Sequence, residues 1–173
     1  RDGIATYPGF MALVEATRPA QVTLVPDTNA QLTSDHGFDL SQDAERLVPI
    51  IASLKAMGCR VSLFMDPEPK SMSAAAEIGA DRVELYTESY AVAHAQGNPD
   101  AAAPFLKAAL TGKSVGLGIN AGHDLNLQNL AHFAQVVQHL DEVSIGHALI
   151  SDALYLGLQN AVGQYKEALR PKD

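Results

Sequence analysis

Short β-rich apolar runs alternate along this chain with longer stretches that carry the spacing of α-helices. Five runs are strand-like, at 21–26, 60–65, 82–87, 115–120 and 142–146. Between them, apolar side chains recur three and four residues apart, which is typical of one buried face of a helix. Glycine and Asn-Pro pairs mark helix ends and starts, and the predicted helices span 39–58, 72–78, 101–110, 127–140 and 152–170.

Strands that each lead into a helix form βα units, and such units build a parallel sheet. We predict an α/β fold, a (β/α)8 TIM barrel, of which this chain covers about strands 4 to 8. A closed eight-stranded barrel needs about 250 residues, whereas the chain has 173. An open, flavodoxin-like sheet of five strands is the alternative, and it would need no further strands.

No linker or change of composition divides the chain, so residues 1–173 are predicted to form a single β/α-barrel domain. The chain begins with Arg1 and not with methionine. We therefore expect this domain to be N-terminally incomplete, with its opening strands outside the sequence.

Charge and cysteine content narrow the classes of function. The net charge is −8 and the pI is about 5.1, which argues against nucleic acid, since nucleic-acid binding needs a basic face. No apolar run approaches the roughly 20 residues of a membrane span. The single cysteine, Cys59, cannot form an intrachain disulfide and fits a reducing cytosol. We expect a cytoplasmic protein without nucleic-acid or membrane partners.

Two predicted strands run out into a glycine followed by a histidine, Gly122-His123 and Gly146-His147. In a β/α barrel the carboxyl ends of the strands carry the catalytic groups, and the last two loops often bind phosphate. His123 is therefore a candidate general acid or base. Gly146-His147 precedes a helix and is a candidate for binding phosphate through backbone N–H groups. A turn histidine bonded to the backbone and a histidine packed under the last helix are the structural alternatives.

Glu84 lies inside a strand-like run, on the same side as Arg82 and Tyr86 by alternation. If this side faces the barrel interior, a buried carboxylate needs partners and is a functional candidate. On the exterior it is a solvated or helix-contacting residue, and the pattern leaves both readings open. The polar segment 33–37 follows the first strand and by itself reads as an ordinary loop.

The sequence lacks the residues needed for dinucleotide binding or for a metal site. Gly116-Leu117-Gly118 has no third glycine for a dinucleotide fingerprint. A metal at His123 and His147 would lack a carboxylate at an obvious spacing. We expect neither a metal nor a cofactor.

Six short segments share their order and spacing with one enzyme family. They are Leu24-Val25-Pro26-Asp27, Thr33-Ser34-Asp35-His36-Gly37, Val61-Ser62-Leu63-Phe64, Glu84-Leu85-Tyr86-Thr87, Asn120-Ala121-Gly122-His123 and Ile145-Gly146-His147-Ala148. Through them the chain resembles the pyridoxine 5′-phosphate synthase (PdxJ) family, from about Phe10 to Leu169. The resemblance implies a β/α barrel. It also implies condensation of 1-deoxy-D-xylulose 5-phosphate with 3-amino-2-oxopropyl phosphate, which gives pyridoxine 5′-phosphate, phosphate and water in de novo vitamin B6 biosynthesis.

The resemblance also implies roles for single residues. His123 would be the proton donor and Glu84 the carboxylate that stabilises the transition state. Thr33 would contact the deoxyxylulose phosphate, whereas Asp124 and the pair Gly146-His147 would bind 3-amino-2-oxopropyl phosphate. Many members have glycine where Asp124 stands. A contact through its backbone amide would tolerate the change, but a carboxylate beside a phosphate would repel it. Two phosphorylated substrates, no cofactor and a homo-oligomer are expected.

The chain also departs from this family. The second catalytic histidine, the catalytic glutamate and the phosphate-binding arginines belong to opening strands that are not matched here, and residues 1–6 contain no glutamate. A site for two phosphates should be locally basic, so we expect the cationic half to lie elsewhere and this chain alone to be inactive. Two other readings stay open: another phosphate-binding barrel aldolase or isomerase, and a non-catalytic sheet domain.

Overall fold

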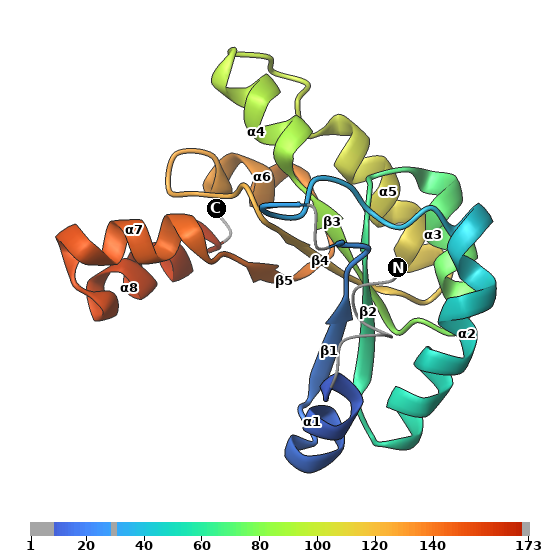
Figure 1. The fold of residues 1–173 in the computed structure, drawn as a ribbon. Helices are drawn as coiled ribbons and strands as arrows, with labels where there is room; N and C mark the ends of the chain where they lie inside the picture. The colour runs from blue at the N-terminus through green and yellow to red at the C-terminus, as the bar shows by residue number, and fades with distance from the viewer. Residues whose placement is uncertain (1–8, 29–30, 171–173) are drawn as a thin grey trace.

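A computed structural model describes residues 9–28 and 31–170 of the chain. The segment 1–6, discussed above for its lack of a glutamate, lies outside these ranges. Within them, five strands form one sheet in the order β1-β2-β3-β4-β5 (Figure 1). The strands are β1 (Gln21–Leu24), β2 (Arg60–Met65), β3 (Arg82–Tyr86), β4 (Gly118–Gly122) and β5 (Leu140–Ser144).

All four pairs of neighbouring strands are parallel, so the carboxyl ends of the strands lie at one edge of the sheet. The strand order never reverses along the sheet. A doubly wound sheet reverses its order at a switch point, as in the order 2-1-3-4-5, whereas the wall of a β/α barrel does not. The flavodoxin-like alternative is therefore wrong, and the α/β-barrel prediction is confirmed for these five strands.

Helices α2 (Leu40–Ala56), α3 (Pro69–Glu77) and α5 (Ala103–Ser114) cover one face of this sheet (Figure 1). The other helices of the described residues are α1 (Phe10–Thr17), α4 (Glu88–Ala95), α6 (Leu130–Val136), α7 (His147–Leu156) and α8 (Leu158–Ala168). Helices α2, α3 and α5 contact β2, β3 and β4 respectively. Val61 and Leu63 of β2 are fully buried in the same apolar cluster as Leu47 and Ile51 of α2. Alternation therefore turns the other side chains of each strand toward the opposite, inner face.

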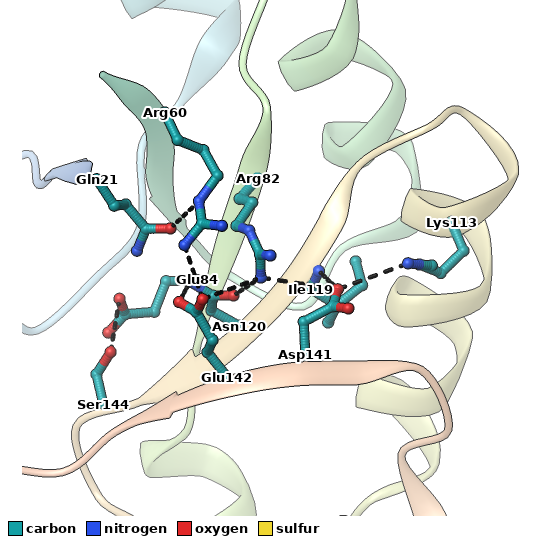
Figure 2. A network of polar contacts seen from close by, with 10 residues as sticks. All are labelled: Gln21, Arg60, Arg82, Glu84, Lys113, Ile119, Asn120, Asp141, Glu142 and Ser144. Atoms are coloured by element: carbon teal, nitrogen blue, oxygen red, sulfur yellow. Dashed lines mark hydrogen bonds and ion pairs between the residues drawn. The ribbon is translucent and has the colours of Figure 1, made fainter. Parts of the chain in front are cut away.

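The inner face carries a network of polar side chains, several of which Figure 2 shows from close by. The guanidinium of Arg60 donates to Oε1 of Glu142 at 2.7 Å and to Oε1 of Gln21 at 2.8 Å. Nη1 of Arg82 donates to Oδ1 of Asn120 at 2.8 Å. Arg60 and Arg82 are the first residues of their strands, so these cations are held at the amino end of the sheet.

The predicted boundaries differ from the structure where glycine changes the chain's direction. Gly116 has φ +88°, so α5 ends at Ser114 and β4 begins at Gly118, three residues after the predicted start. Gly157, with φ 79° and ψ 144°, divides the predicted last helix into α7 and α8. These two helices pack on each other and project from the sheet beyond β5 (Figure 1). Helices α1 and α4 were not predicted.

Candidate functional site

A cavity of about 650 Å³ opens at the carboxyl ends of the strands. Five of the six predicted site residues line it: Thr33, Glu84, His123, Gly146 and His147. The rest of its wall is formed by Val25, Ser34, Phe64, Ser144, Ile145 and Ile150. Residues that are far apart in sequence therefore meet at this edge of the sheet, as the Gly-His pattern predicted.

His123 follows the last residue of β4 directly and has a positive φ of 88°. Its backbone N–H donates to the carbonyl oxygen of Ser144 at 3.2 Å. Non-glycine residues adopt this conformation rarely and at a cost in free energy, and such residues cluster at functional sites. The turn directs the imidazole back over the inner face, where it meets the ring of Tyr86 edge-on at 5.4 Å between centroids.

Both ring nitrogens of His123 contact side chains. Nδ1 lies 2.8 Å from Oδ2 of Asp124, and Nε2 lies 2.7 Å from Oγ1 of Thr33. The backbone N–H of His123 thus binds the backbone of β5, as the alternative of a turn histidine expects, whereas its ring contacts side chains. An imidazole held between a carboxylate and a hydroxyl at the wall of a cavity has the surroundings of an acid or base.

The loop between β1 and α2 carries Thr33 and is anchored against β2. The N–H of Phe38 donates to the carbonyl oxygen of Phe64 at 2.9 Å. A Cβ at Gly37 would lie 2.2 Å from the backbone nitrogen of Asp66, so only glycine allows the loop to approach this closely. This close approach helps to hold Thr33 over the strand ends, which is a reason for glycine at the end of segment 33–37.

Glu84 faces the inner side of β3, which settles the question that alternation left open. It is 7% exposed, and its Oε2 accepts a hydrogen bond from the hydroxyl of Ser144 at 3.1 Å (Figure 2). Burial raises the pKa of Glu84 above its ordinary value, although hydrogen bonds from Ser144 and Thr23 and the nearby His123 oppose this rise. A Cβ at Gly122 would lie 2.5 Å from Oε1 of Glu84. The glycine before His123 thus leaves room for the carboxylate.

Gly146 and His147 lie at the start of a helix, α7, as expected, but the strand before them ends earlier than its predicted end at residue 146. Strand β5 ends at Ser144, Gly146 is the N-cap and His147 is the first helical residue. Gly146 makes no side-chain cap, so the first N–H groups of this ten-residue helix have no such partner. His147 is exposed, and the reading of a histidine packed under the last helix is wrong.

Asp124 does not line the cavity, but its side chain contacts His123, which does. Its backbone N–H donates to Oγ1 of Thr87 at 3.1 Å, and its carbonyl oxygen accepts from Nδ2 of Asn129 at 3.2 Å. The hydroxyl of Thr87 in turn donates to the carbonyl oxygen of Gly122 at 2.6 Å. The amide of Asp124 is therefore engaged within the turn, and its carboxylate points to His123.

Some residues of the site were not singled out from the sequence. Thr87 is fully buried, and its hydroxyl holds the Gly-His turn. In the sequence it stands out only as a threonine at the end of the third predicted strand. Ser144 binds Glu84, and Phe64 and Tyr86 flank the ring of His123. Alternation along the strands places Phe64, Tyr86 and Ser144 on the inner face, where the structure has them. It does not indicate that they contact His123 or Glu84.

The cavity wall contains one carboxylate and two imidazoles, and no lysine or arginine is among its described residues. Arg60 and Arg82 are bonded to other side chains at the amino end of the sheet. In the described part of the chain, no cluster of three or more metal-binding side chains is found. None of the helices in the described residues has the length and apolarity needed to cross a membrane.

Comparisons with known proteins give one family. The family model of "Pyridoxal phosphate biosynthesis protein PdxJ" matches residues 3–171. A pyridoxine 5′-phosphate synthase of Xanthomonas oryzae pv. oryzae is 56% identical over 167 residues, which are 96% of this chain and 66% of that protein. One of Christiangramia forsetii is 52% identical over 161 residues, or 93% of this chain and 68% of its own length. A solved HMG-CoA lyase from Brucella melitensis covers 72% of this chain and is itself covered to 48%, with a TM-score of 0.47 at 19% identity.

Proposed function

This chain belongs to the PdxJ family of pyridoxal phosphate biosynthesis proteins, and we propose that it supplies part of the active site of a pyridoxine 5′-phosphate synthase. The reaction joins 1-deoxy-D-xylulose 5-phosphate to 3-amino-2-oxopropyl phosphate and releases phosphate and water. The observation that carries the proposal is the meeting of Thr33, Glu84, His123, Gly146 and His147 in one cavity. The chain spans 66% of the length of its Xanthomonas oryzae relative, so the activity is proposed for a protein with a complete site.

His123 is the proton donor in this proposal. Imine formation, loss of phosphate and ring closure by aldol addition all need protons delivered to oxygen atoms of the substrates, and an imidazole does this near neutral pH. The contact between its Nε2 and the hydroxyl of Thr33 supports a role at the cavity wall. The aromatic rings of Phe64 and Tyr86 limit the directions in which the imidazole can turn.

Glu84 stabilises positive charge that develops on the imine nitrogen. A carboxylate in a partly dry site interacts with a cation more strongly than it does in water. Its burial and its hydrogen bond from Ser144 support this role, because both fix the position of the carboxylate before the substrate arrives.

Phosphate binding uses two places in the proposal. Thr33 contacts the deoxyxylulose phosphate through its hydroxyl, and the uncapped amino end of α7 at Gly146-His147 binds 3-amino-2-oxopropyl phosphate. A phosphate contact at Asp124 has no support, because its backbone N–H already donates to Thr87 and its carboxylate contacts Nδ1 of His123. Since the described wall has no lysine or arginine, the cationic half of the site comes from outside it, and the chain alone does not turn over substrate.

The proposal extends to the assembly and its location. Residues 1–173 belong to one β/α-barrel domain, N-terminally incomplete in this chain, that functions in the cytoplasm as a homo-oligomer. The exposed apolar side chains of α7 and α8 include Leu154 and Tyr155. They support contact with another copy of the chain at this end of the sheet.

A chimera tests the function. This chain replaces the matching 167 residues of the Xanthomonas oryzae relative, and product formation from both substrates is measured. We expect the chimera to form pyridoxine 5′-phosphate, whereas the chain alone does not.

Substitutions in the chimera test the roles. His123→Ala should lower kcat by about 10²-fold or more, the usual effect of losing a general acid, with smaller changes in KM. Glu84→Gln should behave similarly, because it keeps the shape and removes the charge. His36→Ala, at an exposed loop histidine, is the matched control and should leave kcat unchanged. Near-normal turnover by His123→Ala would show that the acid is misassigned.

A further inference from the structure

The proposed function gives the carboxylate of Asp124 no role, yet this carboxylate holds the central side chain of the site. Its Oδ2 lies 2.8 Å from Nδ1 of His123, and the two side chains are 30% and 20% exposed. The other ring nitrogen, Nε2, lies 2.7 Å from the hydroxyl oxygen of Thr33, on the cavity wall. A carboxylate, an imidazole and a hydroxyl thus follow one another toward the cavity.

We propose that Asp124 is a positioning residue that fixes the tautomer of His123, so that protons enter and leave the ring at Nε2. An ionised carboxylate only accepts hydrogen bonds, so its contact with Nδ1 requires the proton on Nδ1. Nε2 of the neutral ring is then an acceptor for the hydroxyl of Thr33. In the imidazolium, Nε2 carries the N–H, which points toward the hydroxyl oxygen of Thr33 at the cavity wall.

The proton balance of the donor step follows from this arrangement. The imidazolium gives its Nε2 proton to a leaving oxygen of the substrate and becomes the neutral Nδ1–H tautomer. The bond from Nδ1–H to Asp124 exists before and after the transfer, so the ring neither turns nor exchanges its second proton. Without the carboxylate, part of the neutral rings carry the proton on Nε2, and these rings return to the imidazolium by taking a proton at Nδ1, on the side of the ring away from Thr33.

The turn that carries Asp124 is held without its side chain. Its backbone N–H and carbonyl oxygen bind Thr87 and Asn129, and Thr87 also binds Gly122. Thr87 is fully buried, so the turn is anchored on the end of β3. A substitution at Asp124 therefore removes the carboxylate and leaves these three hydrogen bonds in place.

The loop that carries Thr33 offers a matched control. Asp35 and His36 form a second pair of adjacent residues in which a carboxylate contacts Nδ1 of a histidine. Their side chains are 62% and 53% exposed, and neither lines the cavity. Asp35→Ala removes an equivalent carboxylate without touching His123.

Nitrogen-15 NMR of the histidine rings tests the proposal on the whole 173-residue chain, at a pH where the rings are neutral. We expect the Nδ1–H tautomer for His123 in the unsubstituted protein. Asp124→Ala should move the population toward Nε2–H, the form that a free side chain prefers. Asp124→Asn is isosteric but can donate an N–H to Nδ1, as the corresponding change does in serine proteases, and should also favour Nε2–H. Asp35→Ala should leave the resonances of His123 unchanged.

Two results would overturn the proposal: an Nε2–H tautomer in the unsubstituted protein, or unaltered ring resonances in both Asp124 variants. In the chimera, Asp124→Ala should lower kcat about 10-fold or more and change KM by less than about 2-fold, and an unchanged kcat would also count against it. The positioning role rests on the proposed function for its chemistry. If the chimera forms no product but the tautomer shifts as expected, the proposed function is wrong and the effect of Asp124 on the ring stands.

Discussion

At the level of single residues, Gly122 links the backbone turn to the buried carboxylate. A Cβ at this position would lie 2.5 Å from Oε1 of Glu84 and 2.6 Å from the carbonyl oxygen of Ser144. The second of these atoms belongs to the backbone of β5 and cannot move away cheaply. The same carbonyl oxygen accepts the N–H of His123, so a larger residue would disturb both Glu84 and His123.

Gly122→Ala should therefore destabilise the fold by about 1–3 kcal/mol, the usual cost of overpacking. The measurement is the free energy of unfolding from urea denaturation. Gly163→Ala is the control, because a Cβ there meets no atom within 4 Å and alanine favours the helix by up to about 1 kcal/mol. Equal stability of Gly122→Ala and the unsubstituted protein would contradict the close contact.

The buried carboxyl of Glu84 makes stability depend on pH in a defined direction. Burial raises its pKa in the folded state above the ordinary value of 4.5. Between the unfolded and the folded pKa the native state binds more protons, so this group's contribution to stability is full at low pH and is lost as pH rises. Glu84→Gln removes the ionisation, and its stability relative to the unsubstituted protein should increase from pH 4 to pH 7. Urea denaturation at several pH values checks this, and a difference that does not vary with pH would contradict it.

At the level of elements, the sequence predicts strands and helices well where burial alone decides them. The second and third predicted strands agree with β2 and β3, because apolar residues of both are packed against helices. The fourth predicted strand starts before β4, since the apolar residues at 115 and 117 belong to a turn around Gly116. The fifth was placed too late, because β5 opens with Leu140 and has a register shift against β4 between Ile119 and Asn120. The pattern of apolar residues along the chain does not indicate a bulge of this kind.

The break between α7 and α8 gives a prediction about these two helices. Gly157 combines φ 79° with ψ 144°, a region that is essentially restricted to glycine. Gly157→Ala should cost about 1–3 kcal/mol locally and speed up amide hydrogen exchange across both helices, with little change in β2 and β3. Gly163→Ala inside α8 should not have this effect. Unchanged exchange in α7 and α8 would mean that the break tolerates other residues.

At the level of the whole molecule, pattern and resemblance contribute different parts of the site. Alternation and the two Gly-His pairs predict which edge of the sheet carries the chemistry, because parallel strands end together. The contact between Thr33 and His123 joins residues that are 90 positions apart. No local pattern indicates such a pair, and only the family resemblance pointed to Thr33. The resemblance also implied a phosphate contact at residue 124, but it contained no information about the contact of the Asp124 carboxylate with Nδ1 of His123.

The apolar surface of α7 and α8 predicts self-association of this chain. Helix α7 has no buried residue, and Leu154 and Tyr155 are 81% and 89% exposed. Contiguous exposed apolar surface promotes association between molecules. Replacing both residues by lysine should lower the mean mass measured by light scattering at a fixed protein concentration. Leu13→Lys, at an exposed leucine of α1, is the control and should not lower it. Equal masses for all three proteins would show that this surface does not associate.

The positive φ of His123 has a consequence for how this position can change over generations. Glycine would relieve the backbone at residue 123, where φ is 88°, and the substitution would then be favoured by any pressure for stability alone. Under the proposed function, the histidine persists only while its proton chemistry contributes to survival. In a lineage that obtains vitamin B6 from its surroundings, we would therefore expect residue 123 to drift to glycine or asparagine before the buried residues around it change.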